Sequence, residues 1–215
     1  MIDYITSNTT LIWDAFTQHV VLALIPVILA ILISLPLGYV AVRYSKLYYP
    51  LVNLSSILYA IPSLALFLLI PVVIGTSVIS PLNIIIALTI YSVALLVRVV
   101  ADGLNSVDPA VTQAATAMGY RRVRRLLGVE LPIALPVMLA GLRVATVANV
   151  SIVSVGALIG TGGLGALFLR GQQLDYAAPI IVGIILSVLL AAFCDTIIVL
   201  VQRKLTPWSR AGGRA

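Results

Sequence analysis

Charge is the scarcest feature of this sequence. Charged residues account for 9% of its 215 residues, whereas an ordinary soluble domain carries roughly 25%. Hydrophobic residues account for 61%, and the mean hydropathy is +1.16. Because so few charges cannot cover a surface that faces water, the composition excludes an ordinary soluble domain and indicates a protein that folds in a lipid bilayer.

Residues that bind metals or form disulfides are also nearly absent. Cys194 is the one cysteine and His19 the one histidine, which excludes a disulfide framework and a cysteine-based metal site. An intramembrane hydrolase would need a nucleophile–base pair or metal ligands within its spans, and the only carboxylate we expect to be buried is Asp195. The ATP-binding pattern G-x-x-x-x-G-K-[ST] is missing as well. We therefore expect a protein that is not an enzyme, with no catalytic residue, metal or cofactor.

Long apolar stretches dominate what the sequence does contain. Each approaches the roughly 20 apolar residues that a helix needs to cross the hydrocarbon layer, and backbone groups in lipid must be satisfied within their own segment, which favours helices. Internal prolines, Pro62 among them, predict kinks, and Pro71 with Gly75 is expected to end the second stretch. The sequence predicts an all-α, polytopic membrane protein, a single transmembrane domain over residues 1–215 with about five transmembrane helices, at residues 20–42, 51–74, 82–100, 133–155 and 178–201.

Basic residues alternate between the connections and predict the orientation. Residues 1–19 and the second connection contain none, and the fourth connection contains only Arg170. The other basic residues outside the expected spans are Arg43 and Lys46, then Arg121, Arg122, Arg124 and Arg125, then Arg203, Lys204, Arg210 and Arg214. Since basic connections stay in the cytoplasm, we expect the N-terminus outside and the C-terminus cytoplasmic, and the net charge of +6 reflects this topology rather than nucleic-acid binding.

The third connection is too polar to span the membrane and too regular for an unstructured loop. Asp108 followed by Pro109 is typical of a helix start, and Gly119 interrupts a helix-favouring pattern that resumes with four arginines. We expect two short cytoplasmic helices joined at Gly119, the first presenting small side chains to a partner protein. These small side chains are Ala114, Ala115 and Ala117. The alternative is a surface helix whose arginines bind anionic lipid headgroups, each with a binding free energy of about 1 kcal/mol.

The same connection resembles the cytoplasmic loop of importer-type ABC permeases, whose pattern is E-A-A, three residues, G, nine residues, I-x-L-P. The glycine, leucine and proline stand at the family spacing, while Gln113 replaces the usual glutamate and Val129 the isoleucine. The resemblance implies a methionine-importer-type (MetI-like) ABC permease fold and a loop that docks into a groove on a separate ATP-hydrolysing subunit. The residues expected to dock are Gln113, Ala114, Ala115, Gly119, Leu131 and Pro132.

Four further stretches are similar to the permeases of osmoprotectant importers. They are residues 35–38 (LPLG), 61–65 (IPSLA), 159–165 (IGTGGLG) and 203–207 (RKLTP). The resemblance implies the permease subunit of an importer in the bacterial inner membrane, for a solute such as glycine betaine, carnitine, choline or proline. It also implies cytoplasmic ATP-binding subunits, a second permease that is identical or homologous, and an extracytoplasmic solute-binding protein. Methionine or another small solute is the alternative, because methionine permeases are similar in the glycine-rich stretch.

Charges inside the apolar stretches are expected to pair, because an unpaired charge in hydrocarbon is costly. Arg143 and Asp195 form the expected intramembrane pair, with Asp195 and Arg98 as the alternative pair. A role for these charges in the transport path stays open. The glycine turn, residues 160–165, is expected to be a re-entrant turn packed at a subunit interface rather than a substrate contact.

Aromatic and imidazole side chains are the remaining candidates. Tyr39, Tyr59 and Tyr91 offer π faces to a quaternary ammonium group, but they fit equally well as packing residues. His19 is expected at the outer edge of the first span, as an interfacial residue rather than a ligand. The sequence assigns no substrate-binding residue.

Overall fold

All regular elements are helices in the computed structural model, which describes residues 2–210. The first half contains α1 (Ile2–Ser7), α2 (Thr9–Arg43), α3 (Ser45–Ala60), α4 (Ser63–Ile74) and α5 (Pro81–Asn105). The short α6 (Pro109–Ala117), α7 (Arg122–Arg125) and a π-helical turn (Leu126–Glu130) lead into α8 (Leu131–Gly156). A 3-10 turn (Ala157–Ile159), α9 (Gly165–Gln173), α10 (Ala177–Leu205) and a second 3-10 turn (Pro207–Arg210) follow.

Four helical segments are long and apolar enough to cross a membrane. They are α2, α5, α10 and the segment Arg122–Ile159 that contains α8. A fifth crossing results if α3 and α4, which pass the same test only as a pair, form one broken span. The expected all-α architecture with about five spans is therefore confirmed.

The expected second span is broken at Pro62, where the sequence predicts a kink. Its two parts, α3 and α4, meet at an angle of 102°. Pro62 has no N–H to donate and pushes the preceding residue out of the helical region. Ile61 accordingly has φ −65° and ψ 131°. The end of α4 is as expected, because Gly75 is left-handed (φ 76°) and its N–H donates to the carbonyl of Pro71.

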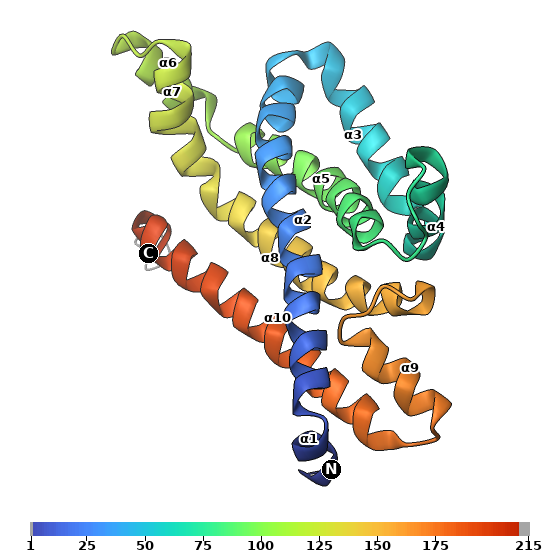
Figure 1. The fold of residues 1–215 in the computed structure, drawn as a ribbon. Coiled ribbons are helices and arrows are strands. Elements are labelled where there is room, and N and C mark those ends of the chain that lie inside the picture. Colours follow the sequence, from blue (N-terminus) through green and yellow to red (C-terminus); the bar gives the residue numbers. More distant parts are fainter. Residues whose placement is uncertain (1, 211–215) are drawn as a thin grey trace.

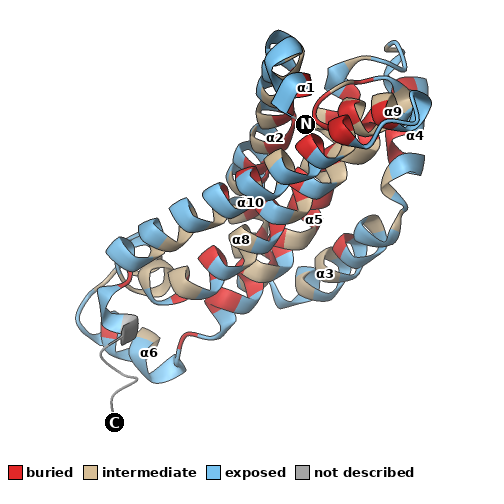
Figure 2. Ribbon diagram, turned by 90° about the horizontal axis from the view of Figure 1, so that it is seen from below, coloured by how far each residue is buried: buried red, intermediate tan, exposed pale blue. Residues whose placement is uncertain are grey.

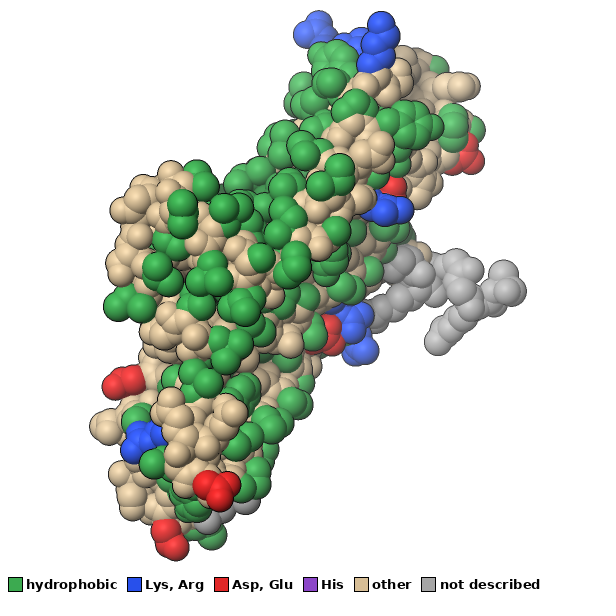
Figure 3. Space-filling model, turned by 90° about the vertical axis from the view of Figure 1, so that its right-hand side faces the viewer, with side chains coloured by type: hydrophobic (Ala, Val, Ile, Leu, Met, Phe, Trp, Pro, Cys, Tyr) green, Lys and Arg blue, Asp and Glu red, His purple; other side chains and the backbone are tan. Residues whose placement is uncertain are grey.

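The hydrophobic core is built around α5. This helix packs against α2, α3, α4 and α8, and the largest cluster joins Leu22 of α2, Phe67 of α4, Leu88 of α5 and Val153 of α8. Figure 2 shows buried residues along α2 and α5, and exposed residues along α10. In Figure 3, hydrophobic side chains cover much of the middle of the molecule. Such an apolar exterior is suited to lipid or to another subunit.

The glycine turn (residues 160–165) is held against α2, on the far side of the molecule from α6 and α7 (Figure 1). The side-chain N–H of Gln18 donates to the carbonyl of Thr161 at 2.7 Å, and its oxygen accepts from the N–H of Gly163 at 3.1 Å. Three glycines of the turn have left-handed φ values between 71° and 84°, which other residues adopt at a cost. These contacts lie within the subunit, and the packing of the turn at a subunit interface stays a prediction.

His19 is a buried structural residue, and the expectation of an interfacial position is wrong. Its side chain is 0% exposed. Its Nε2 lies 2.9 Å from the carbonyl of Val150, which can only accept, while its Nδ1 accepts from the N–H of Leu164 at 3.1 Å. One ring nitrogen therefore donates and the other accepts, as in neutral imidazole. The ring joins α2 to α8 and to the residue that precedes α9.

The glycine turn yields a stability prediction. Gly162→Ala places a methyl group in a left-handed position (φ 84°) and against the amide of Gln18. We expect a cost of about 1–2 kcal/mol from the backbone conformation and about 1 kcal/mol more for each hydrogen bond that Gln18 gives up. The measurement is thermal unfolding of the purified subunit in detergent.

Gly75→Ala is the matched control for this substitution. Gly75 has a similar φ of 76°, but an added Cβ would meet nothing within 4 Å. It should therefore pay only the backbone cost. Equal losses of stability in the two variants would show that Gln18 contributes nothing to holding the turn.

Candidate functional site

A short helical corner projects from one end of the molecule, where α6 and α7 lie (Figure 1). Its first helix begins as expected: the carboxylate of Asp108 accepts a backbone N–H of the first turn at 2.7 Å, and Pro109 occupies the first helical position. The corner turns at Gly119, which has φ 84°. The N–H of Tyr120 then returns to the carbonyl of Ala115 at 3.1 Å. Two short helices joined at Gly119 are therefore confirmed.

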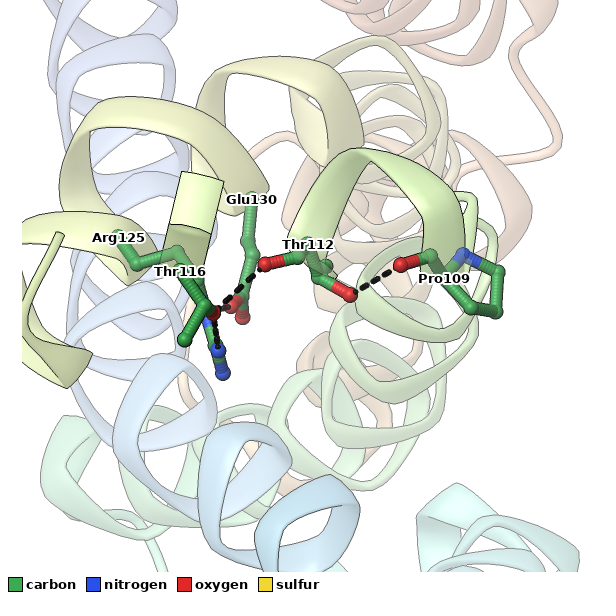
Figure 4. A network of polar contacts seen from close by, with 5 residues as sticks. All are labelled: Pro109, Thr112, Thr116, Arg125 and Glu130. Carbon is green, nitrogen blue, oxygen red and sulfur yellow. Dashed lines mark hydrogen bonds and ion pairs between the residues drawn. The ribbon is translucent and has the colours of Figure 1, made fainter. Parts of the chain in front are cut away.

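A chain of polar contacts holds α6 against the turn into α8 (Figure 4). The Nε of Arg125 donates to the carboxylate of Glu130 at 2.5 Å, and its Nη1 donates to the hydroxyl of Thr116 at 2.8 Å. The hydroxyl of Thr116 donates to the carbonyl of Thr112, whose own hydroxyl donates to the carbonyl of Pro109, each at 2.8 Å. One guanidinium thus fixes α6 relative to the π-helical turn.

Large apolar side chains are exposed on this corner, next to the exposed side chains of Arg121, Arg122 and Arg124. Met118, Val123 and Leu127 are 71%, 67% and 59% exposed. A Cβ added to Gly119 would meet nothing within 4 Å, so the space beside the turn is open. We call Met118, Gly119, Val123 and Leu127 the exposed corner. Large apolar side chains that gather on an exposed surface mark a contact with another molecule.

The six residues singled out from the loop pattern do not share one environment. Gln113, Ala114 and Gly119 are exposed. Ala115 is 1% exposed, so the expectation that it is presented to a partner is wrong. It lies on the inner side of α6, where its carbonyl accepts the returning Tyr120 N–H. The two remaining residues, Leu131 and Pro132, are partly buried at the start of α8.

Arg143 of α8 and Asp195 of α10 form an ion pair with two hydrogen bonds. The Nε of Arg143 donates to Oδ1 of Asp195 at 2.6 Å and its Nη2 donates to Oδ2 at 2.9 Å. This planar, parallel geometry is the strong form of the arginine–carboxylate contact. The alternative pair with Arg98 is wrong, because Arg98 lies 3.7 Å from Asp102 on its own helix.

The three tyrosines separate into two places. Tyr59 and Tyr91 pack edge to face with ring centroids 5.8 Å apart. Tyr39 lies elsewhere, in the wall of a cavity of about 340 Å³ that Arg43 and Arg122 also line. A three-tyrosine cage is therefore not formed by the described residues.

Two polar groupings were not anticipated from the sequence. The hydroxyl of Ser92 donates to the side-chain oxygen of Asn149 at 3.1 Å, inside the α5–α8 contact. Polar residues within apolar stretches are the signal that marks such a pair. The contact of Arg125 with Glu130 crosses a π-helical turn, so it does not follow the helical spacing of three or four residues that reveals ion pairs in a sequence.

The polar chain leads to a prediction about local order. Arg125→Gln removes the ion pair and shortens the reach to Thr116. A hydrogen bond to a charged group contributes about 1.5–3 kcal/mol, so the free energy of opening α6 should fall by about 1–2 kcal/mol after partial replacement by glutamine. Amide hydrogen exchange of residues 110–118 in detergent measures this change.

Arg121→Gln is the control, because the side chain of Arg121 is exposed and outside this chain of contacts. Its exchange should match that of the unmodified protein. If the two variants exchange alike, the Arg125 contacts do not hold α6 in place.

Comparison with known proteins finds a matching family and several relatives of this chain. The family described as a binding-protein-dependent transport system inner membrane component matches residues 30–207. The chain is 36% identical over 209 residues to the osmoprotectant import permease protein OsmW of Salmonella typhimurium, covering 96% of this chain and 97% of that protein. It is 30% identical over 211 residues to the glycine betaine/carnitine/choline transport system permease protein OpuCD of Bacillus subtilis, covering 98% and 91%.

A solved structure agrees with the fold. The inward-facing MetNI methionine ABC transporter has a chain that matches with a TM-score of 0.83 at 22% identity, covering 92% of this chain and 97% of that one. The expected MetI-like fold is confirmed. The family match spans most of the sequence, and the relatives match along nearly their whole length. The chain therefore belongs to the binding-protein-dependent transport system inner membrane components, and is the multi-pass permease subunit of an ABC importer rather than its ATPase.

Proposed function

We propose that this permease carries an osmoprotectant, a small solute such as glycine betaine, carnitine, choline or proline. The observation that carries the proposal is the match at 36% identity to an osmoprotectant import permease along nearly the whole of both chains. A relative at 30% identity has glycine betaine, carnitine and choline in its name. The likeness to a methionine transporter is one of fold, at 22% identity, and does not favour methionine.

The proposed docking site for a cytoplasmic ATP-hydrolysing subunit is the exposed corner together with the neighbouring loop residues. The loop residues proposed as contacts are Gln113, Ala114, Gly119, Leu131 and Pro132, with Ala115 supporting them from the inner side of α6. Exposed apolar side chains favour a protein partner over lipid headgroups, which bind charge. The internal use of Arg125 also removes one arginine from any lipid contact. The glutamine at position 113 makes this contact without the charge of the usual glutamate.

The proposed mechanism is alternating access by two permease subunits, identical or homologous. ATP binding closes the nucleotide-binding subunits, which draws the two corners together and opens the path to an extracytoplasmic solute-binding protein. The corner suits this task because Arg125 links α6 to the π-helical turn that continues into α8. A displacement of the corner is thereby passed to a membrane-spanning helix.

Orientation in the membrane is part of the proposal, with the N-terminus outside and the C-terminus cytoplasmic. In a variant with Cys194→Ala, single cysteines at Thr9 or Gln172 should react with an impermeant thiol reagent in intact cells. Cysteines at Ser106 or Lys204 should react only after the membrane is opened. All four positions are exposed in the subunit, so reagent access reports the side of the membrane. The reverse pattern would overturn the orientation.

Gly119→Asp is the test of docking. Aspartate tolerates the left-handed conformation better than most residues, and nothing in the subunit lies against the new side chain, so the permease should fold and insert normally. A charge without a partner in an apolar contact is costly. We expect co-purification with the ATP-hydrolysing subunit to fall at least tenfold, and uptake of glycine betaine, carnitine, choline or proline into proteoliposomes to stop.

Gly75→Asp is the matched control, since Gly75 has a similar left-handed φ and equally open surroundings away from the corner. It should keep both assembly and uptake. Normal assembly of Gly119→Asp would remove the corner as the docking site. Uptake of methionine by the unmodified complex, with none of the four osmoprotectants carried, would contradict the proposed solute class.

A further inference from the structure

A groove of about 440 Å³ lies between α3 and α5. On α5 its wall follows one face of the helix, where Leu95, Arg98 and Asp102 succeed one another at helical spacing. Tyr91 continues the same face one turn before Leu95. The helix α5 is a candidate membrane span, and Arg98 and Asp102 are charged groups within a largely apolar lining.

The facing wall comes from α3. Ser55 and Tyr59 line the groove. About two helical turns before Ser55, the hydroxyl of Tyr48 donates to the carboxylate of Asp102 at 3.2 Å. Tyr48 contacts Asp102, and Tyr59 contacts Tyr91. The two helices therefore run antiparallel here. The groove therefore has an aromatic end and a charged end.

The charged end contains a loose ion pair. Nε of Arg98 lies 3.7 Å from the carboxylate of Asp102, farther than a hydrogen bond, and the two side chains are 62% and 50% exposed. Arg98 lies about 10 Å from the end of α5, at 1.5 Å per residue. Charges at that depth are costly in lipid and face a polar path instead. A guanidinium carries five donors, so it retains donors for a second carboxylate.

The aromatic end of the groove is formed by Tyr59. This residue is 44% exposed, which leaves its ring open to a ligand. Tyr91 packs against the ring at a centroid distance of 5.8 Å, is 5% exposed and lies outside the lining of the groove. Tyr91, Tyr59 and Asn149 border a neighbouring hollow of about 10 Å³, which is too small for a solute.

We propose that this groove binds the transported solute as a zwitterion, during its passage toward the cytoplasm. The ammonium group lies against the ring of Tyr59, and the carboxylate accepts from Arg98. The inference rests on the proposed function, because only a solute with both charges uses both ends. Attraction of cations to aromatic rings and pairing of guanidinium with carboxylate supply the recognition.

The test uses the complete transporter in proteoliposomes, with the solute-binding protein saturated, so that uptake rates report on the permease. The probe solutes are glycine betaine, carnitine and proline, which carry both charges, and choline, which has no carboxylate. Arg98→Gln should lower uptake of the three zwitterions about tenfold, with Arg98→Lys restoring part of it. Tyr59→Leu should lower uptake by a similar factor, whereas Tyr59→Phe keeps the ring and most of the activity.

Tyr91→Phe is a control next to the groove. The hydroxyl has no hydrogen-bond partner among the described residues and lies outside the lining of the groove, so its removal should leave the melting temperature unchanged or higher. Uptake of the zwitterions should stay unchanged. ATP hydrolysis stimulated by the binding protein should persist in all the groove variants, because the exposed corner is intact. Arg170→Gln, an arginine substitution on α9 away from the groove, should leave uptake unchanged.

Four results would overturn the inference, in distinguishable ways. Unchanged uptake in Arg98→Gln and Tyr59→Leu would exclude the groove while leaving the solute class in place. Loss of the assembled transporter in Arg98→Gln would assign the groove to a contact between subunits. Uptake of choline alone would exclude a zwitterion but keep an osmoprotectant, and uptake of none of the four solutes would remove the proposed function and the groove's ligand together.

Discussion

Backbone polar groups in hydrocarbon have no water to bond, and the arrangement of this chain depends on meeting that requirement. Continuous helices meet it locally, which explains why α2, α5, α8 and α10 account for most of the apolar sequence. Where the helices are interrupted, side chains bond to the freed backbone groups. Gln18 and His19 do this at the glycine turn, where they bond to backbone groups of Thr161, Gly163 and Leu164.

Local signals in the sequence predicted much of the fold, while long-range contacts could not be read from it. The start at Asp108 and the turn at Gly119 follow from the conformational preferences of single residues, and both are present. The role of His19 depends on Val150 and Leu164, which are far from it in the chain. A lone histidine at the end of an apolar stretch gives no sign of such partners.

The break between α3 and α4 shows a different limit. Proline at position 62 predicts an interruption, but the angle of 102° depends on how α4 packs against α5 and α8. The same limit applies to the loop arginines. Four of them stand close together in the sequence, yet only Arg125 reaches both Thr116 and Glu130. Packing decides which side of a helix faces inward. In a single sequence, the only sign of that side is the periodic spacing of apolar residues.

The helix α5, which lines the groove, leads directly toward the exposed corner. The groove is lined by α5 as far as Asp102, and the chain then reaches the cap of α6 at Asp108 within two turns of helix length. The carboxylate of Asp102 also accepts from Tyr48 of α3. A shift of α6 toward or away from the membrane therefore acts on the helix that carries half of the groove wall.

The π-helical turn at Leu126–Glu130 sets the direction in which the exposed corner points. A π turn holds one residue more than an α-helical turn, and each residue of a helix corresponds to a rotation of about 100°. Without that surplus residue, α6 and α7 would be rotated by about this angle around the axis of α8. Met118 and Val123 would then face in a different direction, while every membrane-spanning helix kept its place. The direction in which the corner points therefore depends on the π-helical turn and not on the packing of the membrane-spanning helices.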